Sequence, residues 1–155
     1  MLTDEEAHAL IANAHREWSN GNLDGMLDQF ADSIEFWCNA GNLDGGPIEF
    51  KGKGAFRQSL EAVLRTTRSQ SQLISFRFDG KLAHARASIQ MQSLTSGATL
   101  EASYRQIISY GRTRISRIEE YHDAARLNAF WKLHAEGAAA NMALWNVSPE
   151  PGALK

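Results

Sequence analysis

The stretch LAHARASIQMQSL, residues 82–94, alternates between apolar and polar side chains over most of its length. The apolar positions are Ala83, Ala85, Ala87, Ile89 and Met91, and the polar ones are His84, Arg86, Ser88, Gln90 and Gln92. A period of two residues is typical of a β-strand that buries one face. The stretch therefore predicts a long strand with one face toward a core and one toward solvent.

Similar strands surround this stretch in the second half of the chain. Strands are predicted for residues 72–78, 82–94, 100–110 and 114–122. Ser96-Gly97 and Gly111-Arg112 supply turns, so the last three strands should form an antiparallel meander.

The first half of the chain is mainly helical. Thr3 and Glu6 form a capping box at the start of a helix that Ser19-Asn20-Gly21 ends. Further predicted elements are a helix over 23–31, a strand over 34–39, a loop over 40–47, a helix over 54–64 and a helix capped by Asp123. We therefore expect an α+β fold: a cone-shaped barrel whose strongly curved, mainly antiparallel sheet wraps around N-terminal helices.

The division of the chain follows from the same pattern. Residues 1–137 should form one domain, and residues 138–155, which are alanine-rich and then contain two prolines, should be a loosely held tail. The length of 155 residues suits one domain with a sizeable core.

The composition argues against several partners. The net charge of −2 offers no basic field for nucleic acid or an anionic membrane, and no apolar run has the ~20 residues of a membrane helix. With Cys38 as the single cysteine, no internal disulfide can form, and we expect a cytoplasmic protein. The histidine spacings give no compact metal-ligand set, and no cofactor motif is present, so we predict neither a metal nor a cofactor.

Two segments carry a resemblance to a known group. GNLDGMLDQFADSIEFW, residues 21–37, resembles the opening of the nuclear transport factor 2-like superfamily. ISRIEEYHDAARLNAF, residues 115–130, is similar to the closing strand and helix of its SnoaL-like polyketide cyclase and ketosteroid isomerase-like branch. The resemblance implies a conical fold with a pocket at its open end, and it leaves the reaction open because the fold hosts enzymes and non-enzymes.

The family's catalytic positions are only partly matched. Where ketosteroid isomerases carry a tyrosine and two aspartic acids, this chain has His15, Cys38 and Gln106, which argues against ketosteroid isomerisation. Epoxide hydrolases place an acid at the position of Glu120, but residues 88–90 offer no carboxylate for their second acidic position. The cyclases pair an acidic residue with a histidine, which is closest to this sequence.

Glu120 and His122 are the predicted catalytic residues. Strand alternation places them with Ile118 on one face, and Glu119 and Tyr121 on the other. A carboxylate in an apolar cone should have a raised pKa and could exchange protons near neutral pH. The alternatives are a structural glutamate paired with an arginine such as Arg105 and an ordinary strand-end histidine.

Four further residues are predicted to line the substrate pocket: His15, Cys38, Tyr104 and Gln106. Each has a plain alternative, since His15 could lie at a helix edge and the others could serve only packing. Cys38 in particular is more often a small buried residue than a nucleophile, and a reactive thiolate would need an electropositive neighbour.

Three functions remain open at this level. The first is a cofactor-independent enzyme that cyclises, isomerises or dehydrates a small hydrophobic carbonyl compound by acid/base proton transfer. The second is a non-catalytic ligand-binding module, and the third is a dimerising domain whose own side chains fill the cavity. A ligand site should offer ~300 Å³ or more. We also expect a homodimer, because the outer sheet face should carry apolar residues that no helix covers.

Overall fold

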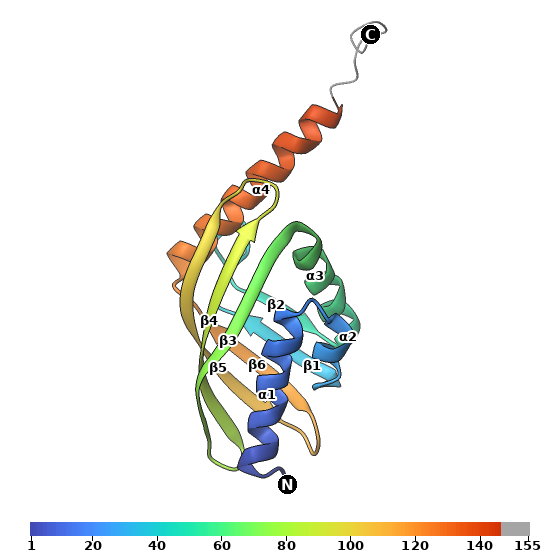
Figure 1. Ribbon diagram of the computed structural model, residues 1–155, viewed down its shortest axis with the longest axis vertical. Coiled ribbons are helices and arrows are strands. Elements are labelled where there is room, and N and C mark those ends of the chain that lie inside the picture. Colours follow the sequence, from blue (N-terminus) through green and yellow to red (C-terminus); the bar gives the residue numbers. More distant parts are fainter. Residues whose placement is uncertain (147–155) are drawn as a thin grey trace, which may run out of the picture.

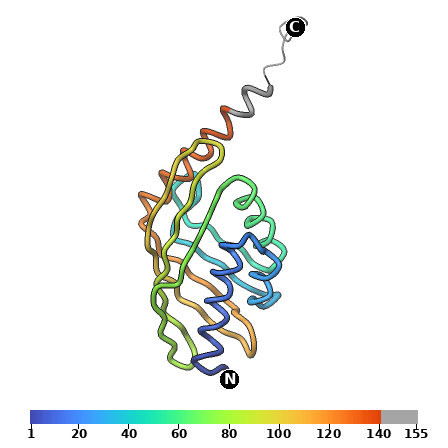
Figure 2. The backbone as a smooth tube through the Cα atoms, in the orientation of Figure 1, coloured from blue at the N-terminus to red at the C-terminus, as the bar shows by residue number. Residues whose placement is uncertain are grey.

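The computed structural model describes the backbone of residues 1–146 and the side chains of residues 1–140 (Figures 1 and 2). The helices are α1 (Asp4–Ser19), α2 (Leu23–Leu27), α3 (Lys53–Thr66) and α4 (Ala124–Asn146). The strands are β1 (Phe30–Cys38), β2 (Ile48–Lys51), β3 (Thr67–Phe78), β4 (Leu82–Ser93), β5 (Thr99–Tyr110) and β6 (Ile115–Tyr121).

The six strands found among residues 1–146 form one curved sheet in the order β2-β1-β6-β5-β4-β3. Only the pairing of β1 with β6 is parallel; the other four pairings are antiparallel. Figure 1 shows the long strands curling around α1, with α2 and α3 beside it, while the sheet stays open. The predicted α+β fold with a mainly antiparallel, curved sheet is confirmed.

The alternation in β4 places side chains as the sequence predicts. Ala83, Ala85, Ala87, Ile89 and Met91 are buried. The opposite face of β4 and β5 is mainly polar, and its exposed residues are His84, Arg86, Gln90, Gln92, Thr99, Glu101, Ser103 and Arg105. The outer face of these strands is therefore more polar than expected: Leu82 and Ile107, both partly buried, are its large apolar residues, because the alternation turns Ile89 and Met91 inward.

The N-terminal helices fill the concave side of the sheet. Thr3 and Glu6 form both hydrogen bonds of the expected capping box at the start of α1. Ile11 and Ala14 of α1 and Phe56 of α3 belong to one buried cluster, to which the sheet contributes Phe30, Ile34, Ala83, Ala85, Ile108, Ile115 and Ile118. Burial of these apolar faces joins the helices to the sheet.

Several boundaries differ from the sequence prediction. The helix expected over 23–31 ends at Leu27, because Phe30 is 1% exposed and pairs with Ile115 in the sheet. A short strand, β2, which the sequence did not predict, directly follows the expected loop and pairs with β1. Strand β3 begins at Thr67 rather than at residue 72, because its first residues pair with the end of β4.

Helix α4 packs across the sheet end opposite the N-terminus and continues to Asn146 (Figure 1). Asp123 caps it by accepting from the backbone N–H of Arg126 at 3.2 Å. A Cβ at Gly137 would lie 2.8 Å from the backbone of Ser96, so glycine permits the close approach of α4 to the β4–β5 turn. The boundary at residue 137 stays a prediction, and residues 147–155 of the expected tail lie outside the described residues.

Within the described part of the chain, no helix is both long enough and apolar enough to span a bilayer.

Candidate active site

A cavity of about 160 Å³ lies between the concave sheet face and the helices. All six predicted site residues line it: His15, Cys38, Tyr104, Gln106, Glu120 and His122. The aromatic part of the walls includes Trp18, Phe30, Phe36 and Trp131. The cavity is smaller than the expected ~300 Å³, but an apolar cavity of about 150 Å³ can hold a benzene-sized molecule.

Strand pairing brings the polar residues of the cavity together. Glu120 on β6 lies opposite Cys38 of β1 on one side and opposite Gln106 of β5 on the other. Side chains that are directly opposite on neighbouring strands share a face, so the three converge on the cavity. His122, two residues beyond Glu120, points to the same side.

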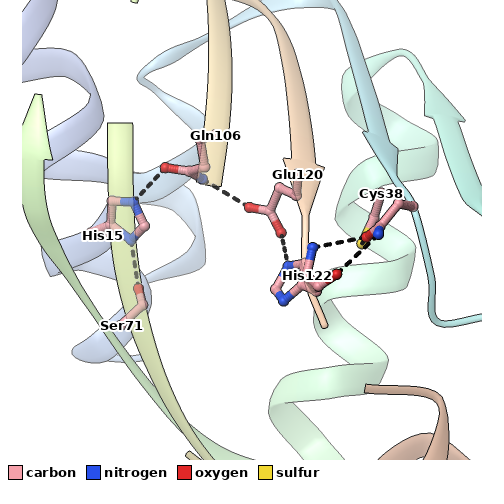
Figure 3. Close-up of polar contacts among 7 residues, drawn as sticks. His15, Cys38, Ser71, Gln106, Glu120 and His122 are labelled. Atoms are coloured by element: carbon pink, nitrogen blue, oxygen red, sulfur yellow. Dashed lines mark hydrogen bonds and ion pairs between the residues drawn. The ribbon is translucent and has the colours of Figure 1, made fainter. Parts of the chain in front are cut away.

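A chain of hydrogen bonds runs through this group (Figure 3). Glu120 Oε2 accepts from Gln106 Nε2 at 2.8 Å, and Gln106 Oε1 lies 2.9 Å from His15 Nε2. Glu120 Oε1 lies 3.0 Å from His122 Nε2. Both carboxylate oxygens of Glu120 thus have a partner, and the chain extends from α1 to the end of β6.

His15, the last side chain in this series of hydrogen bonds on the α1 side, is a neutral imidazole. Burial lowers its pKa, against the opposing effects of Gln106 and Glu120. Because Gln106 Oε1 can only accept, His15 Nε2 carries the proton, and its Nδ1 then accepts from the Ser71 hydroxyl at 2.7 Å. This tautomer directs the Gln106 amide N–H toward Glu120.

His122 is the cationic member of the group. Burial by itself lowers its pKa, but the interactions with Cys38 and Glu120 outweigh burial and raise the pKa to about 9. The ring stacks on Tyr104 at a centroid distance of 4.2 Å, and Asn39 bonds the backbone N–H and C=O of His122 at 2.9 and 3.0 Å. The ring is therefore held in place and carries an N–H toward Glu120 near neutral pH.

Tyr104 adds a neutral phenol to the cavity wall. Burial raises its pKa well above the ordinary value, with smaller contributions from Glu120 and Cys38. Its hydroxyl therefore keeps its proton at physiological pH and can donate a hydrogen bond.

The geometry does not match the alternative in which Glu120 is a structural residue paired with Arg105. Arg105 is exposed on the opposite face of β5, where its register partner is Tyr121, and Glu120 pairs with Gln106 and His122 instead. Among the described residues that line the cavity, Glu120 is the only carboxylate, and none is an arginine or lysine. The arrangement can remove a proton from a bound molecule and supply a donor to its oxygen.

Sequence reasoning missed two polar supports. Ser71 fixes the His15 tautomer, and Asn39 fixes the backbone at His122. Both are small polar residues whose role depends on a neighbouring strand or helix, so no local signal marks them.

One potential ligand group for a metal is also formed. One ligand atom each from Cys38, Glu120 and His122 lies within 4.8 Å of the other two. The sequence prediction compared histidines with one another and could not detect a set that joins two strands.

Comparison with known proteins gives the fold. No protein-family model and no curated protein matches the sequence. A nuclear transport factor 2-like protein from Burkholderia xenovorans superimposes with a TM-score of 0.71, at 16% identity over 84% of this chain and 98% of that one. This chain has the nuclear transport factor 2-like fold. The resemblance noted in the sequence is thereby confirmed for the fold.

Solved enzymes and enzyme candidates share this fold. An LEH-like epoxide hydrolase from M. tuberculosis has a TM-score of 0.67, at 13% identity over 90% of this chain and 97% of that one. A candidate polyketide cyclase from Xanthomonas campestris pv. campestris has a TM-score of 0.69, at 16% identity over 82% and 97% of the two chains. At such identities the likeness concerns the fold and carries no reaction with it.

Proposed function

We propose that the chain is a cofactor-independent enzyme that transfers a proton next to the carbonyl group of a compact hydrophobic compound. The observation that carries this proposal is the Glu120 carboxylate, held between Gln106 and His122 in a cavity whose walls are mainly apolar. A carboxylate beside a cationic imidazole combines a base and an acid within one site. Cyclisation, isomerisation and dehydration all begin with such a step.

Each polar residue has a distinct part in this reaction. Glu120 takes a proton from the carbon next to the carbonyl, and the C–H electron pair moves into an enolate. The imidazolium of His122 has two N–H groups, so one can bond Glu120 while the other donates to the enolate oxygen. Glu120 then returns the proton to another carbon or to a leaving group, and the site regains its initial charge.

The cavity limits the class of substrate. A volume of about 160 Å³ suits a molecule of roughly one ring, and the apolar walls favour a hydrophobic one. Epoxide opening fits less well, because the described cavity residues offer no second carboxylate and no arginine. Within the carbonyl class, a cyclic ketone or enone matches the size and the polar groups.

Deuterium exchange in D₂O tests proton abstraction whichever product the reaction gives. The protein, treated with a chelator, is incubated with compact cyclic ketones and enones, and loss of the α-proton signal is followed by NMR. Glu120→Gln should reduce the exchange rate by about 100-fold or more, the usual contribution of a positioned base. Affinity for the same ketones should change far less, because apolar walls supply most of the binding.

Glu119→Gln is the matched control, since Glu119 lies next in sequence but on the other face of β6. It should leave the exchange rate unchanged. Binding of ketones without exchange by the wild-type protein would instead support the ligand-binding module. A loss of ~1–3 kcal/mol in stability by Glu120→Gln, with equal exchange in both variants, would support a structural glutamate.

A homodimer also remains part of the proposed description. The polar outer face of β4 and β5 means that an interface there would rest on hydrogen bonds and charge pairs rather than apolar burial. Sedimentation velocity at micromolar concentration should show a species of twice the chain mass, and a single monomeric species would contradict the prediction.

A further inference from the structure

Cys38 is a buried nucleophilic residue of the cavity that the proposed proton transfer does not use. It ends β1 and is 3% exposed. The parallel pairing of β1 with β6 sets it directly opposite Glu120, two residues from His122. Three different ligand types, a thiol, a carboxylate and an imidazole, therefore meet at one wall of the cavity.

The geometry of these three groups favours convergence on one point over a nucleophilic relay. In a relay of thiol, imidazole and carboxylate, sulfur and carboxylate bond opposite nitrogens of the ring and lie far apart. Here the sulfur, one ring nitrogen and one carboxylate oxygen are all within 4.8 Å of one another, and His122 Nε2 is 3.0 Å from Glu120 Oε1. A single ion placed among these three atoms would contact all of them.

The separations are close to those of a zinc site. Bonds of about 2.3 Å to sulfur and 2.0–2.1 Å to nitrogen or oxygen, at tetrahedral angles, place ligand atoms about 3.3–3.6 Å apart. Side-chain adjustments on the order of 1 Å bring the present atoms to that range, so no rearrangement of the strands is needed.

The surroundings hold the ligands as the outer contacts of metal sites do. Gln106 donates to Glu120 Oε2 and leaves Oε1 directed at His122. Tyr104 stacks on the His122 ring, and Asn39 holds the His122 backbone. Such outer contacts orient ligands and raise metal affinity.

We propose that Cys38, Glu120 and His122 form a three-ligand site for a divalent ion of the zinc class, with its remaining coordination position toward the apolar cavity. A thiolate and a carboxylate offset the charge of the ion, and the mixed S, N and O donors suit zinc better than magnesium or calcium. Binding releases the thiol proton and the proton held between Glu120 and His122 to the solvent. The metal-bound and proton-transferring forms of the site are thus alternative states, and the inference goes beyond the proposed function.

Titration of the chelator-treated, dialysed protein with Co²⁺ tests the site directly. One equivalent of Co²⁺ should produce the near-ultraviolet charge-transfer band of a cobalt–thiolate bond, and Zn²⁺ should displace it. Because Cys38 is the single cysteine of the chain, any such band reports on this site alone. The absence of a thiolate band at saturating Co²⁺ overturns the proposal.

Substitutions distinguish metal binding at this site from metal binding at surface histidines. Cys38→Ala should abolish the band and weaken Zn²⁺ binding in calorimetry by about 100-fold or more, while Gln106→Leu should weaken it by about 10–100-fold. Glu119→Gln, on the other face of β6, should bind Zn²⁺ as the wild type does. Unchanged Zn²⁺ affinity in Cys38→Ala overturns the proposal.

A second measurement needs only the wild-type protein and therefore tests the site even if a variant fails to fold. In the wild-type protein, one equivalent of Zn²⁺ should slow alkylation of Cys38 by iodoacetamide at least tenfold, because a metal-bound thiolate is shielded. An unchanged alkylation rate contradicts the site. None of these readouts uses a substrate, so failure of the metal proposal and failure of proton transfer are distinguishable.

Discussion

The two faces of β6 present the same chemistry in different surroundings. On the inner face, Glu120 pairs with His122 in the cavity, with side-chain exposures of 15% and 6%. On the outer face, Glu119 pairs with Arg117 at 2.9 Å and accepts from the Tyr121 hydroxyl at 2.9 Å, with exposures of 27% for Glu119 and 31% for Arg117. Each face thus holds one carboxylate, one cationic partner and one further donor.

The difference lies in what each carboxylate can do. Arg117 lowers the pKa of Glu119, with a smaller effect of Tyr121, so Glu119 is a fixed anion beside a permanent cation. The partner of Glu120 is a histidine, which can release its proton. The same alternation of a strand therefore yields a static ion pair outside and a titratable pair inside.

The largest expected effect concerns His122 and the pH dependence of stability. Its folded pKa of about 9 lies above the ordinary value of 6.5, so protonation favours the folded state. This contribution, about 3 kcal/mol, should be complete below pH 6.5 and lost as pH rises through about 9. Urea unfolding of wild type and His122→Asn, both with chelator, should show the two free energies of unfolding converging over that window.

Parallel pH curves for the two proteins would show that the inner pair is not titratable in this range. His15 does not interfere with the measurement. Burial lowers its pKa, so its effect on stability lies at lower pH, where charging it would oppose folding.

The next effect concerns the support of Glu120. Gln106→Leu has nearly the same volume but removes the partner of both His15 and Glu120, and Gln106 is 3% exposed. Leaving buried polar groups without partners should lower the free energy of unfolding by about 1–3 kcal/mol. Ser103→Ala, at an exposed position of the same strand, is the control and should change stability by less than about 0.5 kcal/mol. If both substitutions lowered the free energy of unfolding equally, the buried hydrogen bonds of Gln106 to His15 and Glu120 would not contribute to stability.

The smallest effect is expected for the outer pair, which consists of Arg117 and Glu119. Arg117 also contacts Glu35 at 2.6 Å, so Arg117→Met removes two partly exposed ion pairs. Exposed pairs contribute about 0.2–1 kcal/mol each and weaken with salt, so a loss on the order of 1 kcal/mol is expected in low salt and less in 1 M NaCl. Chemical denaturation at both salt concentrations measures it. If Arg117→Met lowered the free energy of unfolding by more than about 3 kcal/mol at both salt concentrations, the ion pairs of the outer face would not be weaker than the buried contacts of the inner face.

The outer pair should also respond to acid in the opposite sense from His122. Because the pKa of Glu119 is lowered, its contribution is present above the ordinary glutamate pKa and is lost as pH falls through the folded value. In Glu119→Gln this acid-side loss should be absent, and stability between pH 6.5 and 9 should follow the wild type. A changed slope in that window would indicate that the two faces are coupled.

The sequence by itself determined the features that repeat along one segment. The alternation in residues 82–94 fixed which side chains of β4 are buried, and the alternation in residues 118–122 separated Glu120 and His122 from Glu119 and Tyr121. Capping residues located the starts of α1 and α4. These features depend on backbone geometry with a fixed period, which a single segment carries in full.

Only the tertiary structure decided which segments meet. Phe30 looked helical, yet pairing with Ile115 makes it part of a strand, because burial between sheet and helices outweighs local propensity. Cys38 meets Glu120 only because β1 runs parallel to β6, although more than half of the chain separates them. Hydrogen-bond partners, the pKa of His122 and the candidate ligand set all follow from such pairings, and no local period records them.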